Sequence, residues 1–107
     1  MAKPVYSVSL LAADIASGDA AVVDLVEGYT YVVRDITWVV STASDSPATL
    51  QIELDGQTIM AVAVPLGTYI GGRRECRVVA PGHSTLSCSL GGLGCNCSVE
   101  ISGYQLT

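Results

Sequence analysis

Apolar and polar residues alternate with a period of two along most of the chain, which is the pattern of β-strands that bury one face. The alternation predicts eight strands, at residues 5–10, 21–26, 30–40, 50–54, 58–64, 76–80, 85–90 and 95–102. Helical periodicity of useful length is not evident. Residues 12–19 could form one helical turn, but Gly18 and Asp19 favour a loop there.

The segment 30–40 is the longest run of strand-forming residues in the chain. Its continuous Val and Ile content predicts a central strand that directs Trp38 or its alternating neighbours into the core. Asp55-Gly56 predicts a tight hairpin, because both central residues of a type I′ turn need positive φ. Residues 66–75, which include Gly71-Gly72-Arg73-Arg74, are expected to form a polar connection.

Short strands at a spacing of roughly eight to twelve residues are typical of all-β sandwiches. We therefore expect an all-β fold: a single antiparallel β-sandwich, jelly-roll-like, with about eight strands in one domain over residues 1–107. A chain of this length can bury one core without metal ions or covalent crosslinks.

The composition points to association with other subunits. Half of the 107 residues are hydrophobic and only 14% are charged, against roughly 25% in an average soluble domain. A monomer would leave too much apolar surface in water, so we expect a homo-oligomer with a mostly apolar interface. A trimer is favoured only by analogy with viral jelly rolls.

The protein has a net charge of −5, and its one small basic cluster is formed by Arg73, Arg74 and Arg77. Nucleic acid is not an expected partner, because its binding needs a longer basic stripe that displaces counterions. The three arginines fit two interpretations: a solvated loop, or a contact to an acidic patch on a neighbouring subunit.

The chain contains no expected membrane or export segment. The longest uncharged stretches, residues 56–72 and 78–99, are interrupted by prolines and glycines. The N-terminal residues show no hydrophobic region followed by a cleavage site. We expect a protein made in a cytoplasm and no membrane partner.

Four cysteines, Cys76, Cys88, Cys95 and Cys97, lie in the C-terminal third. A hairpin centred on Gly92-Leu93 would place Cys88 opposite Cys97, with Cys95 on the same face as Cys97. Three interpretations remain open: buried core thiols, disulfides formed outside the cell, and a zinc site. The spacing lacks the paired C-x₂-C pattern of zinc modules, so the zinc signal is weak.

No residue pattern indicates catalysis. His83 stands in the turn 81–84 without a local nucleophile signature, and pairs of acids such as Asp14 and Asp19 have the character of solvated turn or strand residues. The glycine-rich pieces join strands and precede no helix that could hold a phosphate. We expect neither an enzyme nor a cofactor.

The aromatic residues fit two interpretations. They could form a sugar-binding platform, or they could fill a sheet face or a subunit contact. The residues concerned are Tyr29, Tyr31, Trp38, Tyr69 and Tyr104.

Four short motifs resemble those of one protein family. The run 28–36, Gly-Tyr-Thr-Tyr-Val-Val-Arg-Asp-Ile, is similar to the G-Y-x-x-V-V-R-D strand of small β-sandwich proteins encoded among the virion genes of tailed bacteriophages, especially those of actinobacteria. Residues 54–59, the turn 81–86 and the end 101–106 continue the similarity in the same order. The resemblance covers about residues 5–107.

The resemblance implies a virion component made in the host cytoplasm, of the kind described as a minor tail protein. Small proteins that decorate the capsid have similar size and composition, so head decoration is the alternative. A carbohydrate- or receptor-binding module on the virion surface is a third hypothesis. In each case the expected partners are copies of the chain itself and other virion proteins.

Overall fold

The computed structural model describes residues 6–43 and 45–106 as eight β-strands. Their bounds are β1 Tyr6–Ala16, β2 Ala20–Asp24, β3 Thr30–Ser41, β4 Ala48–Leu54, β5 Gln57–Val64, β6 Tyr69–Pro81, β7 Thr85–Gly91 and β8 Asn96–Leu106. All strand pairs are antiparallel, and the all-β prediction is confirmed.

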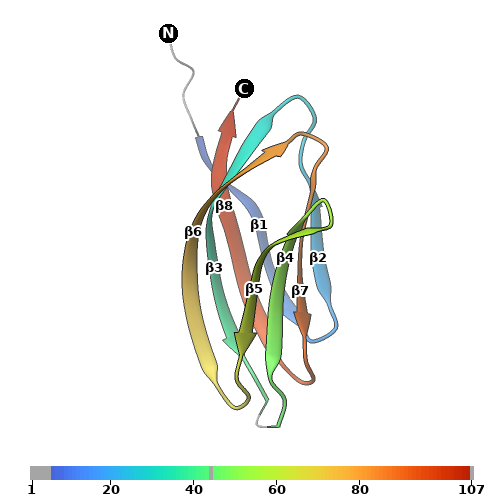
Figure 1. Cartoon of the computed structure of the whole chain (residues 1–107), viewed down its shortest axis with the longest axis vertical. Helices are drawn as coiled ribbons and strands as arrows, with labels where there is room; N and C mark the ends of the chain where they lie inside the picture. The colour runs from blue at the N-terminus through green and yellow to red at the C-terminus, as the bar shows by residue number, and fades with distance from the viewer. Residues whose placement is uncertain (1–5, 44, 107) are drawn as a thin grey trace.

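The strands form two four-stranded sheets that face each other (Figure 1). Sheet A has the order β1-β8-β3-β6, and sheet B has the order β2-β7-β4-β5. The chain crosses between the sheets at every connection except the β4–β5 hairpin. This is the strand order of a jelly roll, so the predicted β-sandwich of jelly-roll type is confirmed.

The β4–β5 hairpin follows from its turn residues. Asp55 has a φ of 52° and Gly56 a φ of 81°, so both central residues adopt the positive values that a type I′ turn requires. The hairpin predicted from Asp55-Gly56 is therefore confirmed.

The core lies between the two sheets and is built from the inward-facing residue of each alternating pair. β3 is central in sheet A, between β8 and β6, as predicted. Its inward residues Val33, Ile36 and Val40 are essentially inaccessible to solvent. Trp38 points to the same side, and its indole ring covers Gly72 so closely that a Cβ there would lie 2.5 Å from the ring.

Sheet A is distorted along one line that crosses its strands. The pairing register shifts at Leu10 in β1 and at Arg34 in β3, both beside Ser102 and Gly103 of β8, and at residues 76–77 in β6, which lie opposite Arg34. β-Bulges at these positions bend the strands and change which side chains face inward. On β1, the consecutive Leu10 and Leu11 are both buried as a result.

Two segments differ from the predicted loops. Residues 12–16 continue β1, and residues 69–75 form the first half of the 13-residue β6, where a turn and a polar connection were expected. Both segments belong to edge strands of sheet A, and backbone pairing to β8 or β3 holds them in place although their outward side chains are small or polar.

Over residues 6–43 and 45–106, the structure has no helix of the length and apolar character that crossing a membrane requires.

Gly103 tests the bend of sheet A. An added Cβ would lie 1.9 Å from the carbonyl oxygen of Val32, a contact that requires the β3 and β8 backbones to separate. We expect Gly103→Ala to lower the free energy of unfolding by about 3 kcal/mol or more. Gly91→Ala is the matched control, because its Cβ would meet only Thr49 at an ordinary 3.8 Å. Urea unfolding measures both, and equal stabilities of the two variants would contradict this account of the bend.

Candidate functional site

The outward face of sheet A presents a regular grid of mostly small and polar side chains. Strand pairing aligns one row of outward residues with the next across β1, β8, β3 and β6. The first row is Ala16, Asn96, Ser41 and Tyr69; the second is Asp14, Ser98, Val39 and Gly71; the third is Ala12, Glu100, Thr37 and Arg73.

Two adjoining hollows lie on this face, with volumes of about 450 and 420 Å³. Asp14, Val39 and Ser98 line both hollows, so we treat them as one shallow channel, called the sheet A groove. The alanines, serines and glycine of the grid leave this space open, because none has a side chain long enough to fill it.

The groove is acidic. Asp14 and Asp19 line its first hollow, and Glu100 lines its second. Ser98 donates a short hydrogen bond to Asp14, and the Ala16 amide donates a long one of 3.4 Å to Asp19. Across the described residues, no cation lies within ion-pair distance of these three carboxylates.

The aromatic side chains are divided among several places. Tyr31 is buried and Trp38 packs over Gly72, while Tyr104 lies beneath the Arg34 guanidinium at 5.1 Å. Tyr69 is 77% exposed at one corner of the groove. Tyr29 is 37% exposed and lies beside Tyr31, with ring centroids 6.4 Å apart. The five aromatic residues therefore do not share one platform; in the groove itself, Tyr69 lines the first hollow and Trp38 the second.

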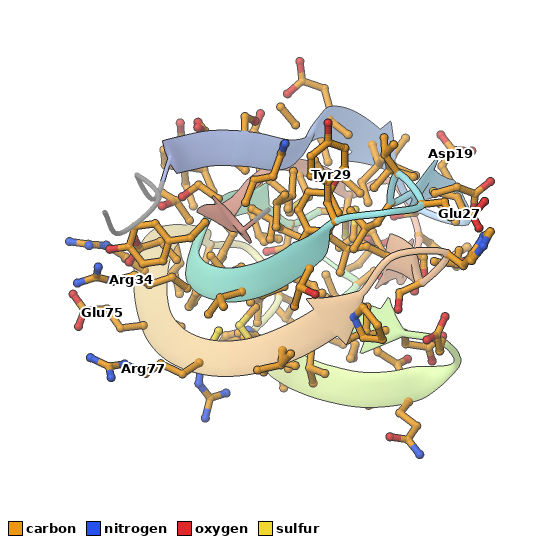
Figure 2. All side chains as sticks on the ribbon, turned by 90° about the horizontal axis from the view of Figure 1, so that it is seen from above. Asp19, Glu27, Tyr29, Arg34, Glu75 and Arg77 are labelled. Carbon is orange, nitrogen blue, oxygen red and sulfur yellow. The ribbon has the colours of Figure 1, made fainter. Side chains whose placement is uncertain are left out.

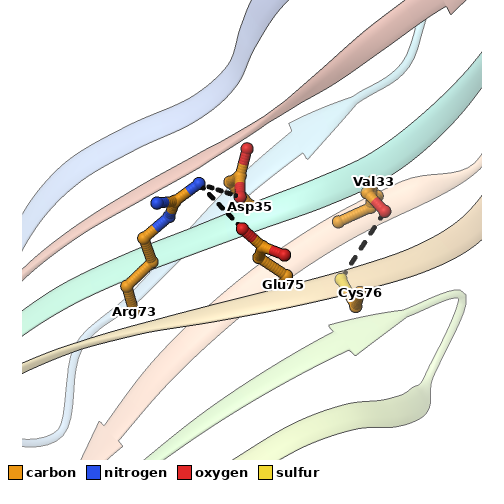
Figure 3. A network of polar contacts seen from close by, with 5 residues as sticks. All are labelled: Val33, Asp35, Arg73, Glu75 and Cys76. Carbon is orange, nitrogen blue, oxygen red and sulfur yellow. Dashed lines mark hydrogen bonds and ion pairs between the residues drawn. The ribbon is translucent and has the colours of Figure 1, made fainter.

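Arg73 makes a network of ion pairs next to the bulge in β6 (Figure 3). Arg73 forms ion pairs of 2.8 Å with Asp35 and 3.2 Å with Glu75. The hydrogen bond and charge of Asp35, with the charge of Glu75, raise the pKa of the Arg73 guanidinium. Arg73 is thus paired within its own chain, while 59% of its side chain is exposed.

Arg74 and Arg77 flank the same bulge, and both are exposed. Neither pairs with a carboxylate in the part of the chain that the structure describes. Arg34, which the sequence did not single out, belongs with them, because β3 and β6 are paired at this level. We call Arg34, Arg73, Arg74 and Arg77 the β6 arginine cluster; it holds four of the five basic residues of the protein.

Most of the basic residues are on the β6 side of the sandwich, together with Asp35 and Glu75, which pair with Arg73. In Figure 2, Arg34 and Arg77 extend on the β6 side, whereas Asp19 and Glu27 extend on the other side. Glu27 lies 3.1 Å from the exposed His83, which occupies its turn with a φ of 76°. His83 is thus a surface turn residue that faces one carboxylate.

The four cysteines are free thiols distributed over both sheets. Cys88 is on β7 of sheet B and Cys97 is on β8 of sheet A, so the predicted hairpin that would place them opposite each other in one sheet is wrong. The turn at Gly92 and Gly94 has positive φ and takes the chain from one sheet to the other. Both thiols nevertheless face the shared core, which is where the interpretation as core residues placed them.

The other two thiols contact the backbone. Cys95 is buried, with carbonyl oxygens of Ser46 and Leu93 at 3.6 and 3.5 Å from its sulfur. Cys76 is half-buried beside the bulge and donates to the Val33 carbonyl at 3.5 Å (Figure 3). Among the described residues, no three His, Cys, Asp or Glu side chains are placed to hold one metal ion.

The buried thiol of Cys97 should make the free energy of unfolding depend on pH. Burial raises its pKa from 9.0 to about 11, helped by Cys88 and Asp14. The unfolded thiol loses its proton first, so the free energy of unfolding should fall as the pH rises between these two values, by about 1.4 kcal/mol per unit for one proton. Below this window Cys97 should contribute no pH dependence.

Urea unfolding across the window checks this prediction. Cys97→Ala should make the decline shallower by one proton, whereas Val99→Ala, a buried neighbour on the same strand, should lower stability without changing the slope. An unchanged slope in Cys97→Ala would mean that this thiol is not a protonated core group.

No protein-family model matches the chain, and no curated protein has a matching sequence.

Proposed function

We propose that the chain is a non-enzymatic structural protein of a bacteriophage virion, associated with the tail, that acts by binding copies of itself and other virion subunits. Two features support this proposal: the phage-type motifs of the sequence and the jelly-roll order of the strands, an architecture shared with viral capsid domains. A fold by itself does not define a function, so the proposal depends mainly on the surface of the molecule.

One end of the sandwich provides that argument. Leu66 is 51% exposed and Leu93 is 77% exposed. Both are linked to the β3–β4 connection: the Gly67 amide donates to the Ala43 carbonyl at 2.7 Å, and the Leu93 amide donates to Ser46 Oγ at 3.0 Å. We call this surface, at the end where β5 turns into β6 and β7 into β8, the apolar end (Figure 1).

Large apolar side chains held on ordered turns are typical of a surface that another protein covers. The apolar end is therefore the observation that best supports a structural role, and we assign it to contact with other virion subunits. A head decoration protein is the alternative, and the number of copies in each particle separates the two. A decoration protein is needed in hundreds of copies, and a tail protein in far fewer.

Self-association is the first test. We expect sedimentation equilibrium of the purified chain at micromolar concentration to give an oligomer, with a trimer as the favoured state. The jelly roll leaves four sheet edges, and a subunit contact protects them. A single species of 11.1 kDa would rule out self-association as part of the function.

The apolar end is tested by the double variant Leu66→Asp and Leu93→Asp. Charges at these positions should lower incorporation into particles at least about tenfold, because a subunit contact would have to bury them unpaired. Val22→Asp is the control, since Val22 is 63% exposed on the outward face of sheet B, away from this end. Quantitative mass spectrometry of purified particles provides the readout, and equal incorporation of both variants would remove the apolar end from the proposal.

A further inference from the structure

We propose that the β6 edge of one copy docks into the sheet A groove of a second copy, with Arg74 and Arg77 against Asp14 and Glu100. This inference rests on the proposed self-association and names the two surfaces that would meet. The contact is heterologous, because it joins two different surfaces of the same chain.

The charges of the two surfaces are complementary. Arg74 and Arg77 have no carboxylate partner, and Asp14 and Glu100 have no cation partner, within residues 6–43 and 45–106. Both sets lie on sheet A: the acids are on β1 and β8, and the arginines are on β6 at the opposite edge. A head-to-tail arrangement of copies around a closed ring would therefore bring the basic edge of each copy against the acidic groove of the next.

The groove also has room for arginine side chains. Its grid includes Ala12, Ala16 and Ser98, whose side chains are small, so the carboxylates border open space. A guanidinium group can form two parallel hydrogen bonds with a carboxylate, and its aliphatic stem can cover apolar surface such as the half-buried Val39. Ile70 and Val79, which are 40% and 63% exposed on β6, would add apolar area to the contact.

Ordinary strand addition at β6 is disfavoured by the shape of this edge. The bulge at residues 76–77 interrupts the ladder, and Arg74 lies opposite the buried Ile36, so a charge projects from the inward side of the strand. Bulges and inward charges are features that prevent edge-to-edge pairing. The side chains of β6 can therefore still contact the face of a sheet in another copy, and the groove is such a face.

Two charge-reversal variants test the contact. The groove variant has Asp14→Lys and Glu100→Lys, and the edge variant has Arg74→Glu and Arg77→Glu. Each alone should raise the dissociation constant of the oligomer at least about tenfold in sedimentation velocity. In an equimolar mixture the contact should re-form between unlike variants, because the edge of each then meets a groove of opposite charge; two of the three contacts of a trimer can be of this kind. The control has Glu27→Lys and Glu53→Lys, which change the net charge as much as the groove variant does, outside both the groove and the apolar end.

The outcomes separate this inference from the proposed function. A monomeric wild type would overturn the groove contact and the self-association part of the proposed function, but not the attachment to other virion subunits. An oligomer that persists in both charge variants, or variants that dissociate but do not re-associate when mixed, would overturn only the groove contact. Binding of a neutral oligosaccharide panel to the wild type that is lost in the groove variant, with the oligomer intact, would assign the groove to a sugar instead. Circular dichroism confirms that each variant is folded.

Discussion

The close approach of the β3 and β8 backbones at Gly103 is the constraint on which sheet A depends. No side chain fits between them, and the register shifts of the neighbouring strands lie at the same level. The bulges turn Leu10 and Leu11 together into the core and place Arg34 outside the regular alternation of β3. One backbone contact thereby links the packing of the interior to the position of the basic cluster.

The charge distribution follows from the same distortion. A long edge strand exposes unpaired backbone groups, and β6 meets this problem with a bulge and with charged residues on both of its faces. Arg73 is neutralised locally by Asp35 and Glu75, whereas Arg74 and Arg77 keep their charge available. The bulge and the charges that protect β6 from unwanted strand pairing thus also make this edge basic, in contrast to the rest of the acidic surface.

The sequence predicted the parts of the fold that depend on local chemistry. Alternation located the eight strands, and the Val- and Ile-rich run 30–40 marked the central strand β3. Asp55-Gly56 specified the hairpin between β4 and β5. It failed at residues 12–16 and 69–75, where the strands are held by pairing partners distant in sequence. It also failed at the turn 91–94, because a glycine-rich turn is compatible with a hairpin or with a crossing between sheets. The groove could not be predicted at all, since it depends on the relative register of four strands.

For the proposed self-association, a net charge of −5 is an electrostatic obstacle, because identical copies repel one another at long range. Attraction then requires the few basic residues to be concentrated where they can meet acids of a neighbour. Four of the five are concentrated at the β6 edge, and the carboxylates of the groove lie across the same sheet. Asp14 is on β1 and Arg74 and Arg77 are on β6, with β8 and β3 between them, and no ion pair joins the two sets among the described residues. In the contact proposed above, their complementarity is realised between molecules.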